Sequence, residues 1–475
     1  MKILFLHIPA GYDEQRKQNL ALFNMVMPIG FLGLADLMEK SGHSVEVIHA
    51  GLEIALNRNF EIASTVGTSS PDLIVVSLHF HHQLWAINKI LKSVKKHFPD
   101  IPIATGGFTA GFFYREIMRK WHFIDFLIRG DGEAPLYQLA NSIENKKDLF
   151  SVPNLSFRSG GKIIHTSFSY CASESVINNM TFTNLALLRN SDFYSGSFLW
   201  SRKKGINDYL NNKYFYLYAG RGCSVNCTFC AGSRTSQKII SNRPGPIFRS
   251  AESIYSDIMN LSSHSKENLY LCFDPPRKTE SPYMELMKLL REQNNKFSMI
   301  FEVYRKMPSK KFISDFSNTF EPAPSALAFS PSTFNEELRK FHTGTYFSNE
   351  SLENALESCS KKGVNTVLYF TLFPEQSFSD LKKEAARAQK LADKYGSEPL
   401  FLPLEIEPGS PWHLNPEKFN LDIRVRSFED FVEFSKKRSF NRTITDTGYQ
   451  FPELDKKMDF LKSRNLTPAD YTKLI

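Results

Sequence analysis

The chain has 475 residues, of which 42% are hydrophobic and 23% are charged. This length is too great for one typical domain, so we expect two or three, and the composition excludes a disordered chain. The formal net charge of +8 is small for this length, and no long run of Lys or Arg occurs. The charge therefore argues against a nucleic-acid partner.

The N-terminus is a short apolar segment without the layout of a signal peptide, and no apolar run approaches about 18 residues. The sequence therefore predicts no membrane span. Three of the six cysteines are isolated from one another along the chain: Cys171, Cys272 and Cys359. Because they form no paired pattern, we expect a reducing, cytoplasmic location.

Residues 1–140 alternate apolar strand patterns with amphipathic helix patterns, which predicts a doubly wound, Rossmann-like parallel sheet. Helices are expected at Pro28–Lys40 and Trp85–His97, and strands at Lys2–Ile8, Val45–His49, Leu73–Leu78, Ile101–Thr105 and Phe123–Ile128. In such sheets ligands bind outside the carboxyl ends of the strands, where glycine permits close backbone approach. Candidate binding residues at these ends are Pro9, Ser77, His79, Gly106, Gly107, Gly130, Gly132 and Glu133.

Residues 141–213 lose this alternation, and we interpret them as a linker between domains. Asn154–His165 predicts a hairpin around Ser159-Gly160-Gly161. The Ser- and Asn-rich remainder, 166–213, has little periodicity, so we assign it no chemistry.

Strand and helix patterns alternate again over residues 214–411. Six strands are expected, at Tyr214–Ala219, Asn268–Phe273, Phe297–Tyr304, Ala326–Phe329, Thr366–Phe373 and Leu400–Ile406. Since six units are too few to close an eight-unit barrel, we predict a partial, TIM-like (β/α)6 barrel with its site at the carboxyl strand ends. Polar residues expected there are Asp274, Glu302, Ser330 and Ser332, and residues 412–475 are predicted to form a small cap that contacts substrate.

Three cysteines, Cys223, Cys227 and Cys230, follow one another with the spacing C-x3-C-x2-C. Soft thiolate ligands select iron–sulfur clusters, zinc or copper(I). Structural zinc and ordinary four-iron clusters take four protein ligands, but the next cysteine and histidine are distant, at Cys272 and His264. Three ligands leave one metal position open, where a substrate or a cofactor can bind.

This loop, with Phe229 before its third cysteine, resembles the cluster motif of the radical S-adenosylmethionine (SAM) enzymes. The resemblance implies a [4Fe–4S] cluster on the three cysteines, with SAM chelating the fourth iron. It also implies that Phe229 lies by the adenine, that Asp274 meets the methionine amine, and that Ser330 and Ser332 meet the ribose. Glu302 is expected to point toward substrate or SAM and is the candidate catalytic residue. At Asp274 the sequence Phe-Asp-Pro replaces the usual Gly-Gly-Glu.

The N-terminal domain resembles the cobalamin-binding domain that precedes the barrel in one branch of this superfamily. The matching segments are PIGFLGLA, Ser77-Leu78-His79, ATGGFTAGFF (104–113) and IRGDGEAPL (128–136). The D-x-H-x-x-G signature that supplies a histidine to cobalt is absent, which leaves the lower cobalt face unassigned. His79, His81 and His82 lie near the relevant strand end, and an empty domain that binds nothing stays an alternative.

The resemblance implies a cobalamin-dependent methyltransferase, in which a 5′-deoxyadenosyl radical activates an unactivated carbon and methylcobalamin supplies the methyl group. The expected partners are a natural-product or peptide substrate and a low-potential electron donor such as flavodoxin or ferredoxin. Two alternatives remain open: a radical rearrangement or cyclisation without methyl transfer, and a non-catalytic iron–sulfur or zinc protein. Methylthiotransferases are set aside because no cysteine for a second cluster precedes Cys171.

Overall fold

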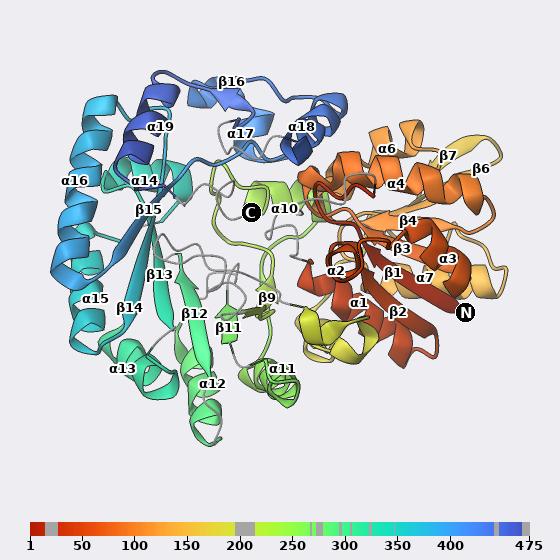
Figure 1. Cartoon of the computed structure of the whole chain (residues 1–475), viewed down its shortest axis with the longest axis horizontal. Helices are drawn as coiled ribbons and strands as arrows, with labels where there is room; N and C mark the ends of the chain where they lie inside the picture. Colours follow the sequence, from red (N-terminus) through yellow and green to blue (C-terminus); the bar gives the residue numbers. More distant parts are fainter. Residues whose placement is uncertain are drawn as a thin grey trace.

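The computed structural model describes residues 1–14, 27–194, 214–266, 268–271, 279–293, 297–304, 306–322, 325–345, 347–440 and 446–467. The candidate Asp274 lies outside the described residues. Figure 1 shows the N-terminal sheet on the right, the barrel strands on the left and the C-terminal cap along the top.

The N-terminal domain is built on a seven-stranded sheet in the order β2-β1-β3-β4-β5-β6-β7. The first five strands are parallel, as predicted, while β6 and β7 form an antiparallel hairpin on the edge of β5. The predicted hairpin therefore exists, and it extends the N-terminal sheet. The strands are β1 Lys2–His7, β2 Ser44–His49, β3 Leu73–Ser77, β4 Ile103–Gly106, β5 Phe126–Ile128, β6 Leu155–Ser159 and β7 Lys162–His165.

The central strands of this sheet are covered by helices on both faces. All five residues of β3 and all residues of β1 from Ile3 onward are buried, which explains their continuous apolar runs. The sequence patterns located α1 and α4 and missed the other helices of this domain, including the 12-residue α7. The helices are α1 Ile29–Lys40, α2 Ala50–Leu56, α3 Ile62–Ser69, α4 Leu84–His97, α5 Phe108–Phe112, α6 Tyr114–Lys120 and α7 Glu133–Glu144.

The second sheet has six parallel strands in the order β15-β14-β13-β12-β11-β8, which confirms a partial, open barrel. Its strands are β8 Phe215–Tyr216, β11 Asn268–Leu271, β12 Ser298–Val303, β13 Ala326–Ser332, β14 Asn365–Thr371 and β15 Glu398–Leu402. Its helices are α11 Ala251–Ser263, α12 Ser281–Arg291, α13 Lys310–Thr319, α14 Glu336–Thr343, α15 Asn349–Lys361 and α16 Phe378–Tyr395.

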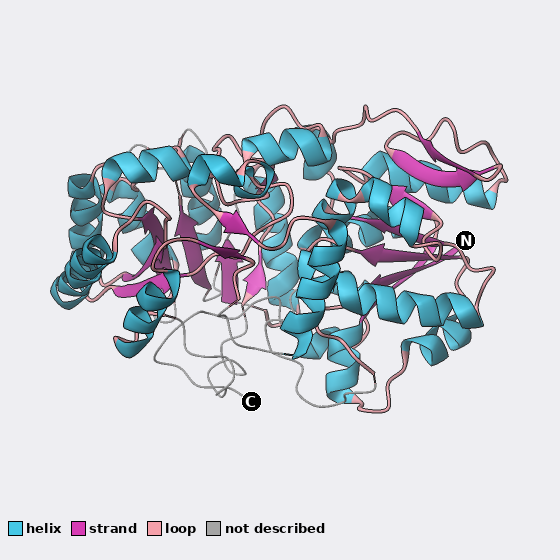
Figure 2. Cartoon of the chain, turned by 90° about the horizontal axis from the view of Figure 1, so that it is seen from above, coloured by secondary structure: helices cyan, strands magenta, loops and turns pink. Residues whose placement is uncertain are grey.

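Alternate residues of the barrel strands form a small inner core, separate from the main core under the helices. Each of the six strands, or the residue just before it, contributes one buried member: Tyr214, Tyr270, Ile300, Ala328, Val367 and Leu400. Because side chains alternate between the faces of a strand, this core identifies which residues face the barrel interior. Figure 2 shows helices around most strands of both sheets, with the strands of the β6–β7 hairpin at the outer edge.

The C-terminal cap consists of short elements that reach from the barrel to the N-terminal domain. They are α17 Pro411–Leu414, β16 Asp422–Ile423, α18 Phe428–Phe440, β17 Tyr449–Gln450 and α19 Leu454–Ser463. Helix α18 contacts α4 and the 3-10 turn His81–Gln83, and the backbone N–H of Trp85 donates to Ser435 Oγ at 2.9 Å. The cap therefore joins the two domains.

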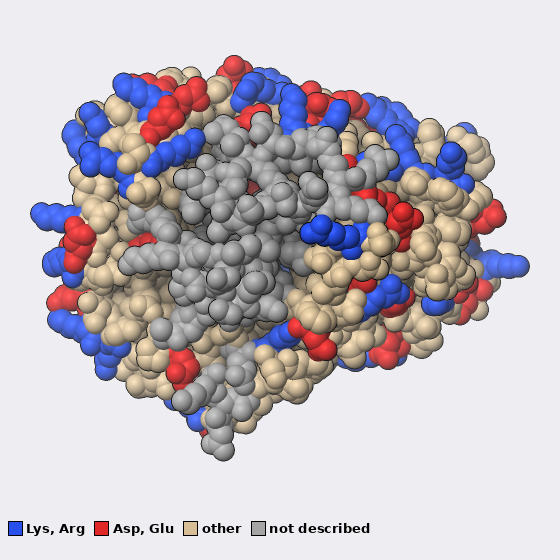
Figure 3. All heavy atoms as spheres, viewed as in Figure 1, with Lys and Arg blue, Asp and Glu red and all other residues tan. Residues whose placement is uncertain are grey.

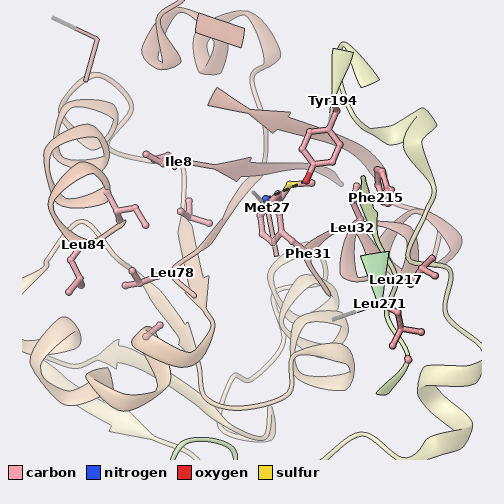
Figure 4. Close-up of a cluster of buried hydrophobic side chains, with 14 of the residues drawn as sticks. Ile8, Met27, Phe31, Leu32, Leu78, Leu84, Tyr194, Phe215, Leu217 and Leu271 are labelled. Atoms are coloured by element: carbon pink, nitrogen blue, oxygen red, sulfur yellow. Dashed lines mark hydrogen bonds between the residues drawn. The ribbon is translucent and has the colours of Figure 1, made fainter. Parts of the chain in front are cut away.

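One continuous hydrophobic core runs through both sheets. Figure 4 shows Leu32 of α1 beside Phe215, with Leu217 and Leu271 of the barrel side nearby, while Phe31 lies beside Met27. Burial of apolar area across this boundary stabilises the contact by about 25 cal/mol for each Å² removed from water. The strand ends of the two sheets are therefore held in a fixed relation.

Within the described part of the chain, none of the helices combines the length and the apolar character needed to span a membrane. On the face shown in Figure 3, the basic and acidic side chains of the described residues are interspersed.

Candidate functional site

The cysteine loop lies between β9 (Gly220–Arg221) and α10 (Arg234–Ser241), and β9 pairs with β10 (Ile247–Phe248). Gly222, directly before the first cysteine, has φ of +86°. A Cβ there would lie 2.8 Å from Arg243 Cδ and 3.1 Å from the Gly245 carbonyl oxygen. Only glycine therefore suits this position, from which the loop turns into the metal-binding segment.

Thr228 anchors the middle of the loop to two distant segments. Its N–H donates to the His342 carbonyl at 2.7 Å, and its Oγ1 lies 2.7 Å from His342 Nδ1. Its carbonyl accepts from the N–H of Trp412 at 2.8 Å. On its other side, His342 Nε2 lies 2.8 Å from Glu375 Oε2, and its ring stacks on Phe373 at 4.2 Å. The loop conformation is thus fixed by residues from α14, the loop after β14 and the cap.

The three thiols have the surroundings of metal ligands. The N–H groups of Val225 and Gly232 point at the sulfurs of Cys223 and Cys230, at 3.4 and 3.2 Å. Burial raises the pKa of Cys227 to about 12, and burial, together with the Glu407 carboxylate, raises the pKa of Cys230 well above its usual range. Buried thiolates require a nearby cation, and three thiolates supported by N–H donors suit an iron–sulfur cluster. The donor set therefore fits a [4Fe–4S] cluster.

Phe229 and Glu407 complete the immediate surroundings of the loop. The half-buried Phe229 ring lies 6.2 Å from that of Phe373 and 5.8 Å from that of Trp412. Glu407 Oε2 accepts from the N–H of Ala231 at 2.6 Å, and burial raises its pKa. An acceptor at this position holds the backbone just after the third cysteine.

Glu302 and Ser330 lie on the inner wall of the barrel. Strand alternation from Ile300 and Ala328 directs them toward the interior. Tyr270, on the adjacent strand, donates its hydroxyl to Glu302 Oε1 at 2.6 Å. Glu302 therefore faces the barrel interior with one oxygen held by Tyr270.

Ser332 lies at a β-bulge where the register between β13 and β14 shifts. It is buried and has φ of +60°, an uncommon conformation for serine. Arg339 of α14 stabilises this end of the strand because its Nε donates to the Pro331 carbonyl at 2.9 Å and its Nη2 to the Thr333 carbonyl at 2.6 Å. The sequence patterns did not indicate this role for Arg339.

The candidate residues of the N-terminal domain gather at the carboxyl edge of its sheet. In the parallel order β2-β1-β3-β4-β5, the strands after β1 are added first on one side of it and then on the other. This topological switch point lies between β1 and β3, and such sheets bind ligands there. His7 Nδ1 lies 2.9 Å from Ser77 Oγ across this point, and Gln83 Nε2 donates to the carbonyls of Ile8 and Ser77. The buried residue Pro9 follows Ile8 directly.

Gly106 and Gly107 bring the next loop against His79. Gly107 has φ of +115°, and a Cβ there would lie 2.7 Å from the Leu78 carbonyl oxygen and 2.9 Å from the His79 backbone. Burial and the Arg221 charge lower the pKa of His79 to about 4, so its imidazole is neutral near pH 7. Hydroxyl, amide and neutral imidazole groups at this edge suit the amide-rich periphery of cobalamin.

The loop after β5 is tied to the cysteine loop by buried charges. Arg221 Nη1 pairs with Asp131 Oδ1 at 2.9 Å and Arg221 Nη2 with Glu133 Oε1 at 2.7 Å. Asp131 also pairs with Arg243. Gly130 and Gly132 flank Asp131. Gly130 packs against Ser241, and Gly132 packs against Leu34. The structure thus gives Glu133 an ion-pair partner in the cluster motif, a contact that the sequence patterns did not indicate.

Comparisons with known proteins identify two protein families along the chain. The model of the B12 binding domain matches residues 21–140, and that of the Radical SAM superfamily matches residues 217–388. The structure is similar to TsrM, a radical SAM methyltransferase from Kitasatospora setae solved with cobalamin and a [4Fe–4S] cluster. The TM-score is 0.67 and the identity 13%, over 100% of this chain and 89% of that chain.

Two curated relatives resemble part of the chain. The anaerobic magnesium-protoporphyrin IX monomethyl ester cyclase of Synechocystis sp. is 25% identical over 236 residues, covering 48% of this chain and 42% of the relative. The cobalamin-dependent radical SAM methyltransferase TokK of Streptomyces tokunonensis is 23% identical over 217 residues, which cover 43% of this chain and 28% of the relative. The matched segments thus span less than half the length of these relatives.

The cofactors that belong to the two matched domains are cobalamin, SAM and a [4Fe–4S] cluster. Together the two matched segments cover more than half of the chain, and the three cysteines lie within the second. The non-catalytic alternative is thereby set aside. This chain belongs to the radical SAM enzymes that carry an N-terminal B12-binding domain.

Proposed function

We propose that this enzyme methylates an unactivated carbon of a small-molecule or peptide substrate. The observation that carries the proposal is the buried contact of Arg221 with Asp131 and Glu133, which links the cysteine loop to the carboxyl edge of the N-terminal sheet. When bound, the cluster and SAM supply a 5′-deoxyadenosyl radical, and cobalamin supplies the methyl group. Similarity to TsrM and TokK supports methyl transfer.

The chain's own residues position these groups. Cys223, Cys227 and Cys230 hold the cluster, and Thr228 with His342 fixes the loop that carries them. Ser77, His79 and the Gly106–Gly107 turn would hold cobalamin, together with Pro9, Gly130 and Gly132. On the barrel wall, Glu302 accepts a hydrogen bond from Tyr270 and is directed toward substrate or SAM. Ser330, Ser332 and Phe229 are assigned to SAM, and a low-potential electron donor is the expected partner.

A second candidate is a radical cyclisation or rearrangement without methyl transfer. It is favoured by the similarity to the magnesium-protoporphyrin IX monomethyl ester cyclase. Both candidates share the radical source and differ in whether SAM also acts as a methyl donor.

The test uses the full chain, reconstituted anaerobically with cluster and cobalamin and given reductant and SAM with a deuterated methyl group. Methyl transfer predicts S-adenosylhomocysteine and deuterium in the cobalamin fraction, together with 5′-deoxyadenosine. Formation of 5′-deoxyadenosine without S-adenosylhomocysteine would overturn methylation and support the second candidate.

A further inference from the structure

A second group of metal-ligating side chains lies outside the cysteine loop, where the N-terminal domain meets the barrel. His81 and His82 belong to the 3-10 turn after β3, and Glu405 follows β15. His82 Nε2 lies 3.0 Å from Glu405 Oε2, His81 Nε2 lies 3.8 Å from the same oxygen, and the three ligand atoms lie within 4.8 Å of one another. We propose that these three residues bind a single divalent transition-metal ion.

The distances suit one ion. Two ligand atoms on a tetrahedral ion with bonds of about 2.0–2.2 Å lie roughly 3.3–3.5 Å apart. The two measured histidine–carboxylate distances, 3.0 and 3.8 Å, bracket that value. Small side-chain rotations would therefore bring all three ligands onto the ion. Two imidazoles and one carboxylate are a donor set for Zn²⁺ or Fe²⁺ and leave further positions open.

The surroundings favour a bound ion over a solvated surface pair. The side chains of His81, His82 and Glu405 are 8%, 29% and 12% exposed. Helix α18 covers His81 with the rings of Phe431 and Phe434, at 5.4 and 6.1 Å. Such an apolar cover limits access of water and strengthens the attraction between a carboxylate and a cation.

The Glu405 carboxylate lies close enough to the His82 imidazole for one ion to contact both groups. Glu405 Oε2 stands 3.0 Å from His82 Nε2, a gap that a small ion can bridge by displacing the two groups slightly. Because its ligands come from both domains, the ion would tie the end of β3 to the end of β15.

Zinc binding tests the proposal without turnover. The full chain, with its cluster reconstituted, is dialysed anaerobically against micromolar Zn²⁺, and zinc and iron are measured in the protein. We expect about one zinc per chain, and His82→Ala or Glu405→Gln should weaken zinc binding by more than about 100-fold. His122→Ala, at an exposed histidine of the same domain, is the matched control and should retain zinc. Unchanged cluster iron in each variant shows that the chain is folded.

Four results would overturn the proposal. The first is wild-type protein without zinc, and the second is equal zinc in wild type and in both variants. The third comes from spectroscopy: X-ray absorption at the zinc edge should show nitrogen and oxygen ligands, and sulfur ligands would assign the zinc to the cysteines instead. In protein loaded with cob(II)alamin, nitrogen hyperfine splitting that His82→Ala abolishes would assign that imidazole to cobalt and equally overturn the proposal. None of these outcomes depends on methyl transfer.

Discussion

The thiols of Cys223, Cys227 and Cys230 are positioned by the backbone around them. Because three protein ligands are the minimum for the cluster, replacing Cys227 with alanine should abolish cluster absorbance and most of the bound iron. Cys171→Ser is the matched control, since Cys171 contacts the carbonyls of Ser241 and Asn242 and takes no part in the loop. Iron analysis and the visible spectrum after anaerobic reconstitution provide the measurement. A full iron load in the Cys227 variant would contradict the assignment.

His79 predicts a specific dependence of stability on pH. Its pKa is lowered to about 4 in the folded chain, first by burial and second by the Arg221 charge, against about 6.5 when unfolded. The folded state therefore binds fewer protons, so the contribution of His79 is complete above pH 6.5 and is lost as the pH falls toward 4. At pH 5 the loss amounts to about 2 kcal/mol of unfolding free energy.

Urea unfolding at pH 7.5 and pH 5 measures this effect. His79→Gln should lose less stability on acidification than wild type, whereas His122→Gln, at an exposed site, should behave as wild type. The same loss in wild type and in His79→Gln would show that another group is responsible.

At the scale of elements, the end of α14 holds the cysteine loop through His342 and Thr228. Thr228→Val removes the hydroxyl and leaves a fully buried imidazole nitrogen without that partner, which costs about 1–3 kcal/mol. We expect the cluster to assemble, because the cysteines remain, while SAM cleavage slows at least tenfold through misplacement of the loop. The rate of SAM cleavage is measured as the 5′-deoxyadenosine formed per bound iron.

The matched control is Thr235→Val, at an exposed residue of α10 that follows the same loop. It should retain wild-type cleavage. If both threonine variants cleave SAM at the wild-type rate, the anchoring role of α14 is wrong.

The elements themselves were largely predictable because their signals are local. Strand and helix patterns identified all six barrel strands and all five parallel strands of the N-terminal sheet. Helix α14 was missed although local signals exist: Asn335 caps its start by accepting from Leu338 N–H, and Gly344 at φ of +62° ends it. Its sequence, EELRKFHT, is mostly polar and therefore gives only a weak apolar pattern.

At the scale of the whole molecule, Arg221 couples the two domains. Arg221→Gln deprives the buried Glu133 of its ion-pair partner, and such losses destabilise by about 3–5 kcal/mol. Urea unfolding at pH 7.5 is the measurement. Arg424→Gln is the matched control because the Arg424–Asp446 pair is exposed and contributes less than about 1 kcal/mol. Equal stability of the two variants would show that the buried contact does not link the domains.

The sequence by itself determined the alternation of strands and helices, the open six-stranded barrel and the cysteine triplet, because each depends on residues close together in the chain. The tertiary structure alone decided which distant residues meet. Thr228 and His342 are 114 residues apart, and Arg221 meets acids from the other domain. His81 and His82 likewise reach Glu405 across the domain boundary. The packing of the two sheets on one continuous core brings these partners together. No local pattern in the chain encodes that packing.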